Sequence, residues 1–221
     1  EMVIQETFFL HKGGKYYYRV HLEKLKHLAG KHQLLELDHY LKAMFTQCPH
    51  QYFNNGPRSS CLKFTLVDDL IELFGHETTL LTRYGLDLNK GRFSERHQQV
   101  QTFFLENDKK TIAMEVPLWL FPQELALYKK LFNSEDVLTG HIDLLRIEDG
   151  KIWVWDYKPN ARKEKYATTQ IFFYAYMLSK RIGIPLSQIS CGYFDHRNTY
   201  VFQPKESFLF KLNKQKTLIT E

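Results

Sequence analysis

The sequence predicts a mixed α/β fold, with a sheet flanked by helices behind a mainly helical N-terminal lobe. Apolar residues recur at helical spacing between residues 21 and 53. Residues 140–158 form two apolar runs joined by Asp149-Gly150, which is the pattern of a β-hairpin. A long apolar helix and two short apolar runs follow, and this order of elements is typical of an α/β core. The 221 residues suffice for a single domain, with the lobe at 1–89 and the core at 90–221.

Composition and charge exclude several classes of protein. The chain is 43% hydrophobic and 15% aromatic, which argues against disorder. Its net charge of +5 weakly favours a polyanionic partner. The cysteines Cys48, Cys61 and Cys191 are odd in number and far apart, so we expect a reducing compartment and no disulfide framework. No apolar run reaches the roughly 18 residues of a membrane helix, and the start lacks a basic segment typical of a signal peptide. We therefore expect a cytoplasmic protein without a membrane anchor.

Local patterns assign the remaining elements. Residues 1–20 contain two aromatic-rich runs around Gly13-Gly14, which predicts a short hairpin. Residues 111–120 predict a strand, and Pro117 favours an edge or a bulge because proline donates no ladder hydrogen bond. The predicted strands at the C-terminal end are 189–195 and 199–202. Apolar spacing predicts further helices at 66–74, 80–84, 93–105, 124–132, 166–181 and from Glu206 to the end.

The central hairpin carries the candidate chemistry. If its loop is the two residues Asp149-Gly150, as in a type I′ turn, Asp143 lies directly opposite Asp156. Their Cβ atoms would then be roughly 4.5–5.5 Å apart. Lys158 shares their face of the strand.

Two carboxylates at this distance repel each other unless one is protonated or a cation lies between them. A divalent metal ion would be such a cation. An exposed Asp–Lys ion pair on a surface hairpin would explain the same residues. However, the opposite face of the hairpin is also apolar, which favours a sheet covered on both sides. Charges inside such a sheet need a specific role.

The helix at 166–181 adds two polar residues to an otherwise apolar segment. Gln170 and Tyr174 are four residues apart and therefore share one helix face. By themselves they would form a hydrogen-bonded polar stripe.

Together these residues resemble a known family. Gly140-x-x-Asp143, Asp156-x-Lys158 and Gln170-x-x-x-Tyr174 resemble motifs II and III and the QxxxY signature of RecB-type nucleases. These nucleases belong to the PD-(D/E)XK superfamily, alongside AddB and the CRISPR-associated RecB-like exonucleases. The resemblance covers about residues 90–202. It implies a restriction-endonuclease-like mixed sheet flanked by helices, in one nuclease domain.

Residues 37–53, around Cys48-Pro49, also resemble the segment of AddB-like members that contributes one cysteine to an iron–sulfur cluster. In that family three more cysteines come from the C-terminus, but here no cysteine follows Cys191. We therefore expect no iron–sulfur cluster and interpret Cys48 as a thiol that packs against helices.

The resemblance implies a further metal ligand on a helix before the strand at 111–120. His97 has about the right separation from that strand, and Glu95 is an alternative because the family spaces its glycine and histidine more closely. His76-Glu77 is a third option but lies too far upstream. Glu115 would contact a metal-bound water or, as we favour from the sequence, lie at the surface of a strand edge.

The resemblance implies hydrolysis of DNA phosphodiester bonds with Mg²⁺ or Mn²⁺. The metal ligands would be His97, Asp143, Asp156 and the Tyr157 carbonyl. Lys158 would orient the attacking water or offset charge in the transition state, and Gln170 and Tyr174 would position Lys158 or the phosphate. Basic residues after the site would follow the DNA backbone, although a solvated loop explains them equally well; they are Arg162, Lys163 and Lys165.

We expect an exonuclease that acts on DNA ends or single strands in repair, recombination or defence. A catalytically silent DNA-binding subunit and a restriction-type endonuclease are the alternatives. The intact set of Asp143, Asp156 and Lys158 argues against the first, and Gln170-x-x-x-Tyr174 against the second. The sequence has no Walker A motif, so a helicase or other repair or defence protein would be a separate chain or domain.

Overall fold

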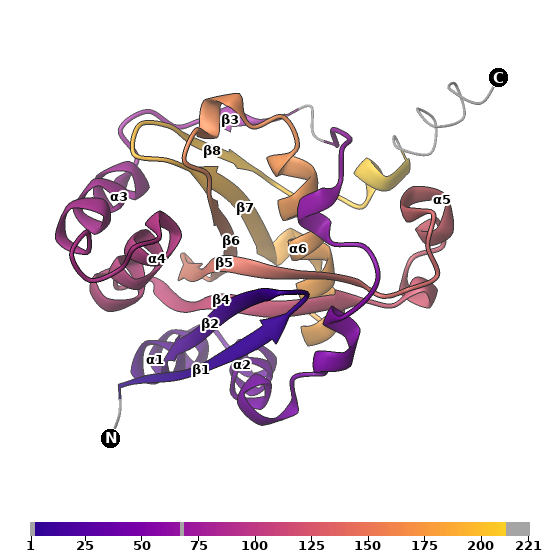
Figure 1. The fold of residues 1–221 in the computed structure, drawn as a ribbon, viewed down its shortest axis with the longest axis horizontal. Coiled ribbons are helices and arrows are strands. Elements are labelled where there is room, and N and C mark those ends of the chain that lie inside the picture. Colours follow the sequence, from indigo (N-terminus) through magenta and orange to yellow (C-terminus); the bar gives the residue numbers. More distant parts are fainter. Residues whose placement is uncertain (1–2, 67–68, 211–221) are drawn as a thin grey trace.

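A single eight-stranded sheet runs through the computed structural model, which describes residues 3–66 and 69–210 (Figure 1). The strand order is β1-β2-β4-β5-β6-β7-β8-β3. Strands β6 and β7 are parallel, and the other described strand pairs are antiparallel. The strands are β1 (Ile4–His11), β2 (Gly14–His21), β3 (Ile71–Glu72), β4 (Thr111–Leu120), β5 (Leu138–Glu148), β6 (Lys151–Tyr157), β7 (Ile189–Phe194) and β8 (Thr199–Phe202).

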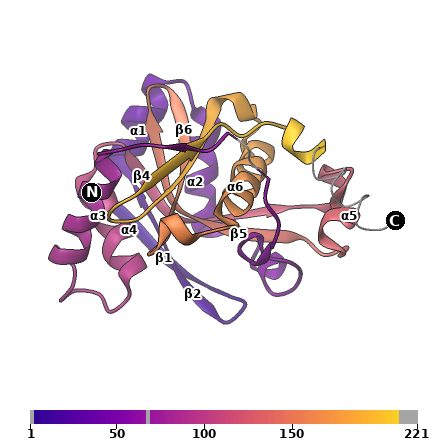
Figure 2. The same ribbon diagram turned by 90° about the horizontal axis from the view of Figure 1, so that it is seen from above.

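Helices cover both faces of this sheet, which confirms the predicted mixed α/β fold (Figure 2). The helices are α1 (Leu22–Lys31), α2 (Leu35–Gln47), α3 (Glu77–Leu88), α4 (Arg96–Asn107), α5 (Tyr128–Phe132) and α6 (Ala167–Ile182). Helices α1, α2 and α6 pack on one face, while α4 packs on the other and α3 packs against α4. None of the helices in the described residues is long and apolar enough to cross a membrane.

The hairpin β5–β6 has the predicted two-residue turn. Asp149 and Gly150 both have positive φ, 50° and 76°, as a type I′ turn requires. The pairs run from Glu148↔Lys151 to Leu144↔Trp155, so the next positions in this register are Asp143 and Asp156. The strand residues between the turn and these acids alternate between the core under α6 and the core under α4. Burial on both faces fixes the register, because a slip of one residue would exchange the two faces.

The N-terminal hairpin β1–β2 was also predicted, but its position in the molecule was not. Its strands extend the main sheet through the pairs Arg19↔Met114 and Val20↔Ala113, so residues from the 1–89 segment join strands of the 90–221 segment. Pro117 lies beyond these β2–β4 pairs, in a part of β4 that pairs with β5 through Pro117↔His141. β4 is an inner strand of the sheet, so Pro117 lies at a local edge only, where β4 has no described pair with β2.

Two helix predictions need correction. The helix at 66–74 is wrong, because residues 71–72 form β3 and the other described residues of the segment are not helical. Leu66 is buried in one core and Leu73 packs against the other, whereas Leu70 and Phe74 are exposed, so the apolar residues at helical spacing do not form one buried face. The helix at 124–132 is shorter than expected: a single 3₁₀ turn at 122–124 precedes α5. Most of the predicted C-terminal helix, residues 211–221, lies outside the described residues.

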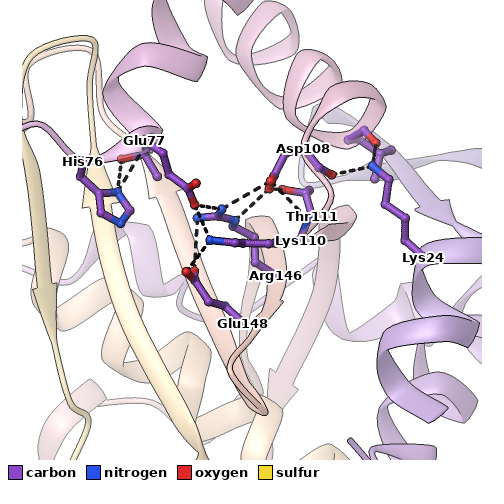
Figure 3. Close-up of polar contacts among 10 residues, drawn as sticks. Lys24, His76, Glu77, Asp108, Lys110, Thr111, Arg146 and Glu148 are labelled. Carbon is purple, nitrogen blue, oxygen red and sulfur yellow. Dashed lines mark hydrogen bonds and ion pairs between the residues drawn. The ribbon is translucent and has the colours of Figure 1, made fainter. Parts of the chain in front are cut away.

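A buried arginine of β5, Arg146, forms ion pairs with the first residue of α3 and with the residue directly after α4 (Figure 3). Arg146 is fully buried, and its Nε donates to Asp108 Oδ2 at 2.9 Å, while Nη2 donates to Glu77. Lys110 Nζ lies 2.9 Å from Glu77 Oε1 and 2.5 Å from Glu148 Oε1. Burial favours the neutral form of Glu77, but hydrogen bonds from Lys110 and Arg146 outweigh it and lower the Glu77 pKa to about 2. The Glu77 carboxyl therefore stays ionised near neutral pH.

Replacing the buried cation tests this network. Arg146→Ala leaves the carboxylate of Asp108, which is 6% exposed, without its main ion-pair partner. Breaking a buried pair from one side should lower the free energy of unfolding by about 3–5 kcal/mol, measurable by urea titration. The matched control is Lys129→Ala, which removes the cation of an exposed pair with Glu135 and should leave stability unchanged. Equal stability of the two variants would contradict the assignment.

Candidate active site

A cavity of about 390 Å³ opens where the ends of β5 and β6 meet α6 and the start of α4. The predicted site residues that line it are Glu95, His97, Asp143, Asp156, Lys158, Gln170 and Tyr174. Further lining residues from β2, β4, β5 and the loop after α2 include Lys15, Tyr16, Arg58, Glu115 and His141. The cavity therefore collects side chains that span more than 150 residues of sequence, from Lys15 to Tyr174.

The two aspartates lie at the open end of the β5–β6 hairpin. Asp156 is 1% exposed, and Asp143 is partly covered. One oxygen of Asp143, Oδ2, accepts a hydrogen bond of 2.9 Å from the backbone N–H of Tyr157. Burial raises the Asp143 pKa well above its usual range, and the charges of Asp156 and Glu115 raise it further. Ionising this carboxyl therefore requires a nearby cation.

Lys158 supplies one cation and is held by α6. Its Nζ lies 2.5 Å from Asp156 Oδ2 and donates to Gln170 Oε1 at 3.0 Å. The Gln170 amide in turn donates to the Tyr174 hydroxyl at 2.7 Å. A series of hydrogen bonds therefore runs from Lys158 through Gln170 to Tyr174, and one turn of α6 holds it in place. Burial favours the neutral amine, but Asp156 and Asp143 outweigh it and raise the Lys158 pKa. Because its oxygen accepts from Gln170, the Tyr174 hydroxyl hydrogen is left to donate to another group.

Gly140 is required where α6 approaches β5. A Cβ atom at this position would lie 2.3 Å from Tyr174 Cε1 and 2.5 Å from Ser59 Oγ. No side chain fits such a gap without displacing Tyr174. The glycine three residues before Asp143 therefore lets α6 place its polar face against the two aspartates.

The start of α4 brings His97 to the same place. Its Nε2 lies 3.1 Å from the Tyr157 carbonyl oxygen and 4.0 Å from Asp143 Oδ2. Burial lowers the His97 pKa, and Asp156 partly offsets this effect. Glu95 precedes α4 and also lines the cavity, although it is exposed. Both motif I candidates of the sequence therefore reach the cavity, and His97 lies against the Tyr157 carbonyl.

These donors fit a divalent metal ion. Adjacent ligands in an octahedral shell of 2.1 Å radius are roughly 3.0 Å apart and opposite ones roughly 4.2 Å. The two distances from His97 Nε2 fall in this range. Burial and neighbouring carboxyls raise the pKa of Asp143 and Glu115, so both side chains favour the protonated form when no cation is near. A hard cation bound by oxygen ligands would stabilise their ionised forms.

Glu115 belongs to the cavity rather than to a surface edge, so the role favoured from the sequence is wrong. Its φ of 53° is in the left-handed region, which is unusual for a residue with a side chain. The carboxyl accepts a hydrogen bond of 2.7 Å from Gln101 Nε2 in α4. Burial raises the Glu115 pKa to about 7, Gln101 opposes this effect, and Asp156 adds to it. Glu115 therefore lines the same cavity as the two aspartates. A strand pattern in the sequence does not predict its positive φ.

One wall of the cavity was not predicted. Tyr16 stacks on His141 with ring centroids 3.8 Å apart, and Arg58 donates to the Tyr16 hydroxyl. Lys15 lies beside Tyr16 on β2. These residues are far from the three motifs in sequence, and the only local signal was the aromatic run of the hairpin.

The three predicted DNA-binding residues lie outside the cavity lining. Arg162 and Lys163 belong to a 3₁₀ turn, Ala161–Lys163, that follows β6, and Lys165 precedes α6. All three side chains are exposed on the loop that connects Lys158 to α6. Their positions leave them accessible to a ligand that extends beyond the cavity.

Comparison with known families agrees with this geometry. Residues 43–216 match the family model of the PD-(D/E)XK nuclease superfamily. The chain therefore belongs to this superfamily, and its mixed sheet flanked by helices is consistent with the restriction-endonuclease-like fold. Members of the superfamily are nucleases that usually use divalent metal ions such as Mg²⁺ and act on DNA. No curated protein matches the sequence.

Metal binding can be tested by thermal stability. Asp143→Asn removes a carboxyl that is costly to ionise without metal, so the metal-free variant should melt higher than the unaltered chain. Mn²⁺ at about 100 times its dissociation constant should stabilise the unaltered chain by about 2.7 kcal/mol and Asp143→Asn by much less. Glu135→Gln, at an exposed position, is the control and should keep the full metal effect. An unchanged metal effect in Asp143→Asn would exclude Asp143 as a ligand.

The same measurement should depend on pH. Because burial and neighbouring charges raise the pKa of Asp143 and Glu115, protons compete with the metal well above the usual range for a carboxyl. The Mn²⁺ concentration for half-maximal stabilisation should therefore fall as pH rises from 6 to 8. A constant midpoint over this range would show that these carboxyls are already ionised before the metal binds.

Proposed function

We propose that the chain is a RecB-type deoxyribonuclease that uses Mg²⁺ or Mn²⁺ and degrades DNA from ends or as single strands. The observation that carries this proposal is the hydrogen-bonded chain from Tyr174 through Gln170 to Lys158, beside Asp143 and Asp156. In this arrangement, Gln170 and Tyr174 of α6 hold the Lys158 amine in place. This arrangement supports the RecB-type branch within the superfamily.

The metal would be held by Asp143, Asp156, His97 and the Tyr157 carbonyl. When bound, such an ion lowers the pKa of water and polarises a phosphate oxygen. Both effects favour attack on a phosphodiester, whose negative charge otherwise repels nucleophiles.

Lys158 contributes a fixed positive charge. Its amine is held between Asp156 and Gln170, so it loses little freedom when the scissile phosphate binds. It orients the attacking water and offsets the charge that develops on the phosphate oxygens. Tyr174 has a hydroxyl hydrogen available for a phosphate oxygen, while its own oxygen is held by Gln170.

Positive and aromatic side chains around the cavity suit the rest of a DNA strand. Lys15 and Arg58 line the cavity and would contact phosphates next to the scissile one, and Tyr16, which stacks on the buried His141, would contact a base or sugar. Arg162, Lys163 and Lys165 would contact the backbone further along the strand. A helicase or another repair or defence protein on a separate chain would supply unwound DNA.

Cleavage assays on defined DNA test the activity. The purified chain should degrade end-labelled linear and single-stranded DNA with Mg²⁺ or Mn²⁺ and spare covalently closed circles. Asp156→Ala and Lys158→Ala should each lower the rate by about 10²–10³-fold or more. Lys129→Ala, at an exposed position far from these residues in sequence, should retain full activity.

The outcomes separate the alternatives. Activity that persists in both Asp156→Ala and Lys158→Ala would contradict the site assignment. Cleavage of closed circles at one sequence would favour a restriction-type endonuclease. Binding without cleavage under all metals and DNA ends would favour a silent DNA-binding subunit.

A further inference from the structure

A second cluster of metal-ligand side chains lies outside the proposed nuclease site. It contains His11 from the end of β1, Cys48 directly after α2, and His50 from the 3₁₀ turn His50–Phe53. One ligand atom from each residue lies within 4.8 Å of the other two. His11 and Cys48 are buried at 1% and 8% exposure, whereas His50 is exposed. The cluster thus has a buried base and an open side.

We propose that His11, Cys48 and His50 form a binding site for a thiolate-preferring transition metal ion such as Zn²⁺. Two imidazoles and one thiolate are typical zinc ligands, and three protein ligands leave the fourth tetrahedral position to water on the exposed side. This set has no carboxylate and contains sulfur, so it differs from the oxygen-rich set of Asp143 and Asp156. The two sites would therefore select different metals.

The distances between the donors suit such an ion. The ring nitrogens His11 Nε2 and His50 Nδ1 are 3.0 Å apart. Two nitrogens bound at 2.0–2.1 Å in a tetrahedral site lie roughly 3.3 Å from each other. A movement of a few tenths of an ångström by the exposed His50 ring is therefore sufficient to admit the metal between them.

The buried imidazole is already oriented as a ligand. The His11 ring stacks on Phe53 with centroids 4.0 Å apart and planes 11° apart. Its other nitrogen, Nδ1, lies 2.9 Å from His141 Nε2. With a metal on Nε2, the Nδ1–H of His11 donates to His141, which is the arrangement that usually fixes a metal-bound histidine. Burial, together with the charges of His50 and Arg58, lowers the His11 pKa to about 4. The ring is therefore neutral near pH 7, and protons compete little with a metal ion for its nitrogen.

Cys48 then has a different role from the packing thiol expected from the sequence. Burial raises the pKa of its thiol to about 12, so without metal the sulfur is protonated. Binding of Zn²⁺ forms the sulfur–metal bond and releases the thiol proton to solvent, with no change in oxidation state. The site would need no cysteine from the C-terminal part of the chain.

The proposed metal would tie the N-terminal hairpin to the corner after α2. His11 is the last residue of β1, and the hairpin continues to Lys15 and Tyr16, which line the nuclease cavity. His141, the partner of His11, stacks on Tyr16 in the same cavity wall. Binding of the metal does not depend on the nuclease function proposed above, but its effect on that wall would reach the nuclease site.

Zinc titration of the full chain tests the site. The variant Asp143→Asn/Asp156→Asn serves as background, so that zinc in the nuclease cavity is not counted and the result is independent of cleavage. We expect one tightly bound Zn²⁺ per chain, and Co²⁺ in its place should show a thiolate charge-transfer band. His50→Ala, at an exposed position that should not disturb folding, should weaken zinc binding by more than about 100-fold.

Matched controls separate ligation from general damage. Cys48→Ser should abolish the cobalt–thiolate band, whereas Cys61→Ser, at an exposed thiol, should retain it. His39→Ala, at an exposed position of α2, should bind zinc like the background variant. Hydrogen exchange should show that zinc protects the backbone amides of β1 and β2 in the background variant but not in His50→Ala.

The proposal would be overturned by the absence of bound zinc in the background variant. It would equally be overturned if His50→Ala and Cys48→Ser, both folded by circular dichroism, kept the same zinc affinity. An iron-containing chromophore lost in Cys48→Ser would also contradict it, since it would assign the cysteine to a different cofactor.

Discussion

Repulsion between two carboxylates at the open end of a β-hairpin is the constraint on which the rest of the site depends. The turn at Asp149-Gly150 fixes a register that brings Asp143 and Asp156 to adjacent positions, next to two hydrophobic cores. The charge they create must be balanced, and Lys158 does so in part. Helix α6 is positioned by Gly140 so that its polar pair holds this lysine. Burial and the charge of Asp156 raise the pKa of Asp143, so a cation that binds in the cavity would stabilise the ionised form of this carboxyl.

Features that depend on local sequence were predictable. The turn needs two residues with positive φ, and Asp-Gly provides them, so the register of β5–β6 followed from the sequence. Gln170 and Tyr174 share one helix face because of their spacing, and Gly183 ends the helix with a φ of 69°. Within the site, the positions that meet across this hairpin and on this helix face therefore follow from the sequence.

Features that depend on distant contacts were not predictable. Arg146 is fully buried on a strand with apolar neighbours, and its partners Asp108 and Glu77 lie 38 and 69 residues away. Glu115 reaches the cavity through a backbone angle that a strand pattern does not encode. The helix predicted at 66–74 is wrong for a related reason: Leu66 and Leu73 pack against different cores and Phe74 is exposed, so their helical spacing does not give one buried face.

The family match begins at residue 43, inside α2, whereas Lys15 and Tyr16 of the β1–β2 hairpin form a wall of the same cavity. The residues that hold the aspartates, the lysine and α6 therefore lie within the matched segment, whereas the wall combines Lys15 and Tyr16 from outside this segment with Arg58 and His141 from inside it. One part of the cavity lining is thus encoded in a stretch of the chain that is separate from the aspartates and the lysine. Substitutions at Lys15 or Tyr16 would change the shape of the cavity without altering the aspartates, the lysine or α6.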